Sequence, residues 1–377
     1  MNISLKKVFL LFLGVFSLFS CKNEENTVVE NLSQYVEPRI GTAHCRWFHF
    51  APGAMPFGMA KPAPSTNGSL GNKSGWEATG YDYRDNTIEG FPCLHEFQIG
   101  GISLMPTVGE LLTVPGLPSD TIKTGYRSRF SHENEVVKPG YYSVLLEDYQ
   151  IQAELTATER VAFQRFTFPQ GQEKHILFNI GNRQGESGAV KDAYVVYNQD
   201  GTVEGWVITE PEYVKKYQPG AVVPLYFFAV LDKEPLNYGA YNGNVQQLGV
   251  RESKGVGAGM YFSFASENQE VVTAKIGLSY TSVENARLNL QQEASDLDFD
   301  RAKERAQATW EDYLGRIRVE TECREDKVKF YTGLYHALLG RGLASDVNGA
   351  YPRNDGSVGQ LPMKEGTPLY NIYVSSG

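Results

Sequence analysis

Basic clusters, cysteine pairs and long apolar runs are scarce in this 377-residue sequence, and each absence excludes a class of protein. The formal net charge is −9, and Lys and Arg form no cluster outside the extreme N-terminus. A nucleic-acid partner is therefore not expected, because phosphate contacts need clustered positive charge. No Cys or His spacing is typical of a zinc site. The aromatic content, by contrast, is high at 12%.

The chain has four cysteines, namely Cys21, Cys45, Cys93 and Cys323. Cys21 follows a leader-like segment, so three remain, and an odd number gives no complete disulfide framework. Cys45 and Cys93 either pair with each other or are both buried thiols.

The N-terminus has the features of an export signal. Two lysines precede the apolar run Val8–Phe19, which is too short to span a bilayer as a stable helix. The run ends in Leu18-Phe19-Ser20-Cys21, which resembles a bacterial lipoprotein box and implies cleavage before Cys21 and lipid attachment to its sulfur. An ordinary signal peptide with a fortuitous cysteine is the alternative. We expect a lipid-anchored protein of the bacterial cell envelope, at the outer-membrane surface or in the periplasm.

Residues 75–106 concentrate the groups that suit a sugar. Trp76, Tyr81 and Tyr83 offer flat apolar faces, His95 and Glu96 offer hydrogen-bonding groups, and several glycines let the backbone turn sharply. A sugar has apolar C–H faces and a rim of hydroxyls, which match this combination. The alternative is a turn-rich β region whose aromatic side chains pack in a core.

The remaining pattern predicts a mainly β protein. Short runs with partial period-2 alternation follow one another from about residue 120 to 290, which indicates an antiparallel sandwich or barrel. Helical periodicity begins near residue 283, and amphipathic helices are predicted over 299–314 and 326–339. Further strands are predicted over Tyr35–Thr42, around Gly109–Val114 and over Ile317–Glu320.

Nine motifs in order resemble glycoside hydrolase family 92, the exo-acting α-mannosidases of bacteria. As they stand here, they begin with YVEPRIGT (35–42), PGAMPFGM (52–59), GYDYRDNTIEGF (80–91) and LMP (104–106). They continue with FSH (130–132), PGYYSV (139–144), AELTATER (153–160), FYTGLYH (330–336) and DVNG (346–349). The resemblance covers residues 35–355.

The resemblance implies an N-terminal β-sandwich, a helical linker and the start of a C-terminal (α/α)6 barrel. The corresponding segments are a signal peptide (1–20), a tether (21–34), the sandwich (35–282), the linker (283–318) and an incomplete barrel domain (319–377). The implied function is that of the N-terminal portion of a calcium-dependent inverting exo-α-mannosidase acting on mannose-containing glycans. The catalytic carboxylates and the Ca²⁺ ligands are expected beyond Gly377, so this part alone is expected to be inactive.

The same resemblance gives the candidate substrate-binding residues. Trp76 is the first choice as a sugar-stacking platform, with a core Trp as the alternative. The family usually has Phe-Ser-His-Thr-His where this chain has Phe-Pro-Cys-Leu-His over 91–95, so Cys93 replaces the first histidine. His95 either lines the pocket or is a satisfied structural histidine. Asp346 resembles a family loop residue near the pocket, although a turn-capping role fits equally well. Tyr81 and Glu96 complete the set of candidate substrate-binding residues, which contains no metal ligand.

Two other functions stay open at this point. The first is a non-catalytic surface lipoprotein whose β-sandwich binds glycans without cleaving them. The second is a catalytically inactive relative of the mannosidases, suggested by Cys93 and by the bulky segment His44–Phe50.

Overall fold

The computed structural model describes residues 30–43, 49–66, 80–96, 99–119, 124–184, 188–340 and 342–373, without the side chains of residues 96, 99, 100, 212 and 213. Residues 1–31 and 32–377 form two separate units, and the elements named below belong to the second unit. In the described part of the chain, no helix is both long enough and apolar enough to cross a membrane.

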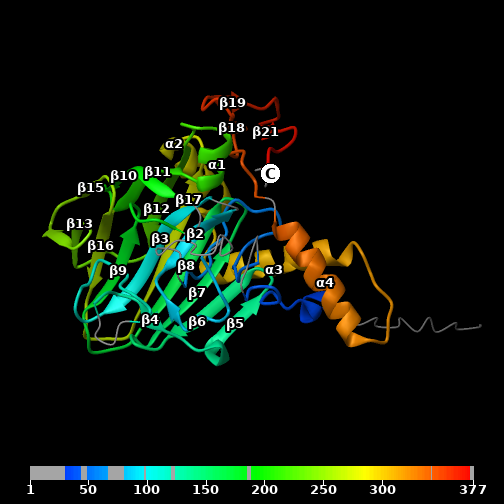
Figure 1. The fold of residues 1–377 in the computed structure, drawn as a ribbon, viewed down its shortest axis with the longest axis horizontal. Helices are drawn as coiled ribbons and strands as arrows, with labels where there is room; N and C mark the ends of the chain where they lie inside the picture. Colours follow the sequence, from blue (N-terminus) through cyan, green and yellow to red (C-terminus); the bar gives the residue numbers. More distant parts are fainter. Residues whose placement is uncertain are drawn as a thin grey trace, which may run out of the picture. The chain divides into compact units, whose positions relative to one another are not determined.

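Two large antiparallel sheets dominate the unit (Figure 1). The nine-stranded sheet has the order β15 (Glu252–Lys254), β10 (Ala189–Tyr197), β11 (Thr202–Glu210), β12 (Val223–Leu231), β17 (Glu270–Ser279), β8 (Val161–Phe168), β7 (Ile151–Ala157), β6 (Tyr141–Leu146) and β5 (Glu135–Lys138). The six-stranded sheet has the order β14 (Val245–Leu248), β13 (Asn237–Asn242), β16 (Ala258–Phe264), β9 (Lys174–Asn179), β3 (Ile99–Val108) and β2 (Phe91–Glu96).

The main hydrophobic core lies between the two sheets. Both sheets contribute alternate side chains to it, and Phe178 of β9 stacks on Phe227 of β12 with ring centroids 6.4 Å apart. The alternation is clear along β11, where every second residue from Val203 to Thr209 is buried. A strand whose side chains alternate in this way covers a core with one face, as expected for a sandwich.

Helices cover the outer face of the nine-stranded sheet. The helix α2 (Val283–Ala294) begins at Ser282, whose hydroxyl accepts a hydrogen bond from the Asn285 N–H, and α3 (Phe299–Gly315) begins at Asp298 in the same way. A second core of buried residues lies between these helices and the sheet. At Gly277 of β17, any side chain would collide with the Ala286 carbonyl of α2, so this close approach requires glycine.

The helix α4 (Arg324–Leu339) packs against the N-terminal segment. This segment contains the 3-10 helix η1 (Leu32–Tyr35), whose first N–H groups donate to the Glu311 carboxylate of α3. The remaining elements are the short helices η3 (His132–Asn134) and α1 (Glu212–Tyr217) and the strand pairs β1 (Thr87–Ile88) with β4 (Ser128–Arg129), β18 (Ala350–Pro352) with β19 (Val358–Gln360), and β20 (Met363–Lys364) with β21 (Thr367–Pro368).

The predicted fold class, a mainly β protein with an antiparallel sandwich followed by helices, is confirmed. Three strand predictions were wrong. Residues 35–42 form successive turns instead, closed by hydrogen bonds such as Ile40 N–H to the Glu37 carbonyl. Residues 109–114 follow the end of β3 as an irregular loop and form no strand. Residues 317–320 pair with no strand in the described part of the chain. Instead, the Tyr331 hydroxyl donates to the Ile317 carbonyl and accepts from the Val319 N–H.

Candidate functional site

A cavity of about 1040 Å³ lies between the α1 connection and the C-terminal segment. Figure 1 shows α1 and the β18–β19 hairpin at the same end of the unit. The cavity is lined by Pro211, Val214, Tyr217, Gln218, residues 220–224, Tyr226, Tyr280, Thr281, Ala344, residues 352–358, Ile372 and Tyr373. Its volume is at the upper end of the roughly 300–1,000 Å³ found for small-molecule sites.

Exposure divides the lining into a floor and a rim. Tyr280 and Ala344 form the floor, since they are only 4% and 2% exposed. We define the cavity rim as Tyr217, Val222, Asp355 and Tyr373. Its three large apolar members are 58%, 44% and 42% exposed, in chain order. Exposed apolar groups gathered around one concavity mark an interaction surface rather than a core.

The polar part of the cavity rim is the tip of the β18–β19 hairpin. The register Pro352↔Val358 leaves Arg353–Ser357 as the tip, and Gly356 adopts a φ of 81° there, which favours glycine. Asp355 Oδ1 accepts hydrogen bonds from the Ser357 N–H (2.9 Å) and the Ser357 hydroxyl (2.6 Å). These bonds lower the pKa of the exposed Asp355 carboxyl, so it is ionised at neutral pH.

Asp346, one of the predicted pocket residues, lies beneath this hairpin rather than in the cavity. Its Oδ2 accepts hydrogen bonds from Ser279 Oγ (2.9 Å) and Thr281 Oγ1 (2.5 Å), and its Oδ1 accepts one from Asn289 Nδ2 (2.7 Å). We call these four residues the Asp346 joint. Burial raises the pKa of Asp346, although the three hydrogen bonds act in the opposite direction. Because Thr281 also lines the cavity, Asp346 lies one hydrogen bond away from the cavity wall.

The Asp346 joint fixes the hairpin to α2. The Val347 N–H donates to Asn289 Oδ1, and Asn348 Nδ2 donates to Asn285 Oδ1 at 2.8 Å. The Asp346 N–H and carbonyl then close the turn that leads into β18, through Ala350 and Gly349. Of the two readings of this loop, the structure gives Asp346 the partners of a turn anchor, and its contact with a sugar stays a prediction.

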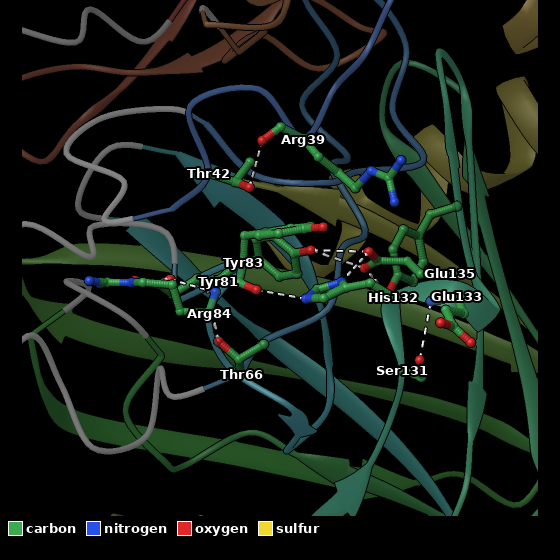
Figure 2. A network of polar contacts seen from close by, with 12 residues as sticks. Arg39, Thr42, Thr66, Tyr81, Tyr83, Arg84, Ser131, His132, Glu133 and Glu135 are labelled. Carbon is green, nitrogen blue, oxygen red and sulfur yellow. Dashed lines mark hydrogen bonds and ion pairs between the residues drawn. The ribbon is translucent and has the colours of Figure 1, made fainter.

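Tyr81 is also held by protein groups. Its side chain is 0% exposed, and its hydroxyl donates to Glu135 Oε1 at 3.0 Å (Figure 2). The Tyr142 hydroxyl donates to the same Glu135 oxygen. His132 Nδ1 lies 2.8 Å from the other Glu135 oxygen, and its Nε2 lies 2.6 Å from the Tyr83 carbonyl oxygen. Burial next to Glu135 raises the pKa of Tyr81 far above neutral pH. The ring with an exposed face in this network is Tyr83, which is 40% exposed and stacks on His132.

His95 is buried in β2 but only half satisfied. Its Nδ1 lies 2.9 Å from the Lys61 carbonyl oxygen, and its ring stacks on Phe50 at 4.9 Å. Burial lowers the pKa of His95 to about 4, so the ring is neutral with its hydrogen on Nδ1. Its Nε2 has no hydrogen-bond partner among the described residues. His95, a predicted pocket residue, therefore keeps one buried acceptor atom without a hydrogen bond.

The other predicted residues cannot be placed. Trp76, Cys21 and Cys45 lie outside the described residues, as does most of His44–Phe50, and Glu96 is described only by its backbone at the end of β2.

Cys93 is a free buried thiol whose sulfur accepts a hydrogen bond from Gln164 Nε2, and burial raises its pKa. Among the residues that are placed, Tyr81, His95 and Asp346 have separate surroundings and do not meet at one site.

The groups that line the cavity are suited to binding a sugar. Tyr faces and amide, guanidinium and carboxylate groups suit a ligand with apolar faces and many hydroxyls. Asp355 supplies the carboxylate of the described lining, whereas an inverting glycosidase needs two carboxyls ~6.5–9.5 Å apart. Within the described ranges, no three His, Cys, Asp or Glu residues come together as metal ligands.

Sequence reasoning missed the cavity rim. Asp355 stands in an Asn-Asp-Gly turn, a signal that indicated a loop but not its position in space. Tyr217 belongs to a short helix that was not predicted, because the segment ends in Pro219-Gly220 and is too brief for a clear helical period.

Comparison with known proteins gives a consistent family. The model for the glycosyl hydrolase family 92 N-terminal domain matches residues 35–279, and the model for the glycosyl hydrolase family 92 catalytic domain matches residues 285–375. An uncharacterized secreted glycosidase of Arthroderma benhamiae is 26% identical over 336 residues, which cover 81% of this chain and 41% of the relative.

Solved structures agree with these matches. A family GH92 α-mannosidase of Bacteroides thetaiotaomicron, in complex with mannoimidazole, is 27% identical with a TM-score of 0.80, over 91% of this chain and 44% of that one. A family GH92 inverting mannosidase from strain VPI-5482 of the same species shares the fold at 23% identity and a TM-score of 0.71, again over 91% and 44%. The chain thus spans less than half the length of each relative. Its two consecutive domain matches identify it as a member of glycosyl hydrolase family 92.

Proposed function

We propose that this chain is the N-terminal portion of a calcium-dependent, inverting exo-α-mannosidase and that the cavity forms part of its glycan site. The observation that carries the proposal is the cavity itself, where exposed aromatic rings and the exposed carboxylate of Asp355 meet on residues 352–373 of the catalytic-domain match. The likeness to an α-mannosidase solved with mannoimidazole supports mannose as the sugar.

In this proposal the described residues bind and orient the glycan. Asp355 accepts hydrogen bonds from sugar hydroxyls through Oδ2, because Ser357 occupies only Oδ1. The Asp346 joint holds the hairpin in position, so Asp346 is a positioning residue. The acid that protonates the leaving oxygen and the base that activates water are assigned to none of the described residues.

The proposed function includes a Ca²⁺ ion, but we assign none of its ligands to the described residues. Ca²⁺ takes six to eight oxygen ligands, and the described residues provide no such acidic cluster. The ion would be held elsewhere in the complete protein and would act there on the sugar hydroxyls.

The test is mannose release from α-mannosides by the complete protein, with and without a calcium chelator. We expect hydrolysis that the chelator abolishes and that added Ca²⁺ restores, with inversion at the anomeric carbon visible by NMR. Absence of hydrolysis across α-mannosides of every linkage would reject the enzyme and favour the second candidate, a glycan-binding lipoprotein, because the cavity does not itself require catalytic carboxylates.

We also propose that the mature protein is lipid-anchored through Cys21 in the cell envelope. The basic residues, the short apolar run and the terminal cysteine of the leader support this localisation. The expected result is that the wild-type protein sediments with membranes and that the Cys21→Ala variant does not. Equal sedimentation of both would overturn the anchor.

A further inference from the structure

His132 of η3 faces a hydrogen-bond acceptor with each of its ring nitrogens. Its Nδ1 lies 2.8 Å from Glu135 Oε2, and its Nε2 lies 2.6 Å from the Tyr83 carbonyl oxygen (Figure 2). A neutral imidazole has one N–H, so it donates to only one of these oxygens and turns a ring lone pair toward the other. The imidazolium form donates through both nitrogens and satisfies both contacts.

The surroundings of Glu135 favour the same charge state. The Glu135 side chain is 0% exposed, and its Oε1 accepts hydrogen bonds from the Tyr81 and Tyr142 hydroxyls. Hydrogen bonds of this kind stabilise the carboxylate form. A buried carboxylate also needs a cation as a partner, and the His132 ring is the group in contact with its second oxygen.

Arg39 belongs to the same network but has a carboxylate of its own. Its Nε and Nη2 donate to the two oxygens of Glu37, at 2.9 and 3.1 Å. The hydrogen bond to Glu37 raises the pKa of Arg39, and the Glu135 charge adds to this effect. Glu133, next to His132 on η3, is exposed. In the described part of the chain, His132 is therefore the cation that contacts the Glu135 carboxylate.

A second histidine shows the opposite case in the same fold. His175 Nε2 lies 2.9 Å from the Gly109 carbonyl oxygen, but its Nδ1 lies 2.8 Å from the Ser263 hydroxyl, which can donate to it. A single N–H on Nε2 is enough to satisfy this ring, and burial lowers the pKa of His175. The partners thus predict a neutral ring at His175 and a charged one at His132.

We propose that His132 is an imidazolium at neutral pH and that this charge clamps the Tyr83 turn to the sandwich. The Tyr83 turn is Asp82–Asp85, in which the Asp85 N–H donates to the Asp82 carbonyl. The clamp joins the turn to β5 through Glu135, and the Tyr83 ring stacks on the His132 ring at 4.0 Å. When the pH rises and the ring loses one hydrogen, one of its two contacts is lost. The turn is therefore held at neutral pH and released as the pH rises, and His132 is its positioning residue.

The first test is ¹⁵N NMR of the histidine rings in the complete protein, labelled at histidine alone. At pH 7 we expect hydrogens on both nitrogens of His132 and a hydrogen on Nε2 only of His175. The His132 signals are assigned by their loss in His132→Gln. If that variant does not fold, they are assigned by cross-relaxation with the Tyr83 ring. A single hydrogen on the His132 ring at pH 7 would overturn the inference.

The second test is hydrogen exchange of the Tyr83 turn, corrected for the intrinsic exchange rate at each pH. In wild type, protection should fall about tenfold from pH 7 to pH 9, because one charge-assisted hydrogen bond is lost. His132→Gln should show low protection at both pH values. Glu133→Gln is the matched control, since Glu133 is exposed on the same short helix, and it should keep the wild-type profile. A flat profile in wild type, or the same profile in His132→Gln, would reject the clamp.

Discussion

The Asp346 joint and the cavity rim contain the same kinds of residue but use them differently. In the joint, both oxygens of Asp346 are taken by Ser279, Thr281 and Asn289, and the carboxylate is 0% exposed. On the rim, Asp355 is exposed and shares only one oxygen with Ser357. A buried polar group needs partners from the protein, whereas an exposed one keeps capacity for a ligand. The number of unused hydrogen-bond positions therefore separates a structural aspartate from a binding one.

The largest effect is expected at the Asp346 joint. Asp346→Ala leaves two hydroxyls and one amide of the joint without their acceptor in a buried place, and it removes the side-chain hydrogen bond from Asp346 to Asn289 of α2. We expect a loss of about 3–5 kcal/mol in the free energy of unfolding, measured by urea denaturation of the protein. The matched control is Asp355→Ala, which should leave the free energy of unfolding close to the wild-type value because the side chain is exposed. Similar losses for both variants would contradict the comparison.

For kcat/KM on substrate, we expect the larger effect at Asp355 of the cavity rim. Asp355→Ala removes a charged acceptor from the cavity rim, and hydrogen bonds to charged groups are stronger than those between neutral groups. The kcat/KM of the complete enzyme on α-mannosides should therefore fall about 10- to 100-fold, with the melting temperature of wild type. Asp355→Asn keeps an acceptor oxygen without the charge, so its kcat/KM should lie between those of wild type and Asp355→Ala. A kcat/KM that stays at the wild-type value in both variants would remove Asp355 from the site.

A partly buried histidine with a lowered pKa gives a third, pH-dependent contrast. His336 of α4 stacks on His49 with ring centroids 4.4 Å apart, and its Nε2 lies 3.3 Å from the Pro38 carbonyl oxygen. Burial, and then the neighbouring His49, lower the pKa of His336 from 6.5 to about 4. The unfolded chain therefore binds a proton below pH 6.5 that the folded chain refuses until about pH 4, so stability falls as the pH falls through this window.

The measurement is the free energy of unfolding at pH 7 and pH 5 for wild type and His336→Phe. Wild type should lose about 2 kcal/mol more than the variant between these two values, because each pKa unit of the shift contributes about 1.4 kcal/mol. The same pH dependence in both proteins would show that His336 is not the group responsible.

A structural feature can be predicted from the sequence when the interactions that cause it are between residues close together along the chain. The two helices α2 and α3 begin where predicted, because Ser282 and Asp298 cap them within three residues along the chain. The strands of the sandwich follow from period-2 patterns in the same local way. Asp346 was chosen from its motif, but two of its partners lie far away in sequence: Ser279 is the last residue of β17, and Thr281 follows that strand. A pattern of residue types names candidates, and only tertiary structure shows which hydrogen-bond positions are already occupied.

The smallest effect is expected at Tyr81, a candidate chosen from the sequence whose hydroxyl already has a protein partner. Tyr81→Phe keeps the buried ring and removes only the hydroxyl that donates to Glu135, which also accepts from Tyr142. The free energy of unfolding should fall by about 1 kcal/mol, because one buried hydrogen bond is lost while Glu135 keeps other donors. KM for α-mannosides should stay within twofold of wild type, since the ring is 0% exposed. If KM rises several-fold at unchanged stability, the hydroxyl contacts the glycan in the complete protein, and the occupied hydrogen bond to Glu135 is not its principal role.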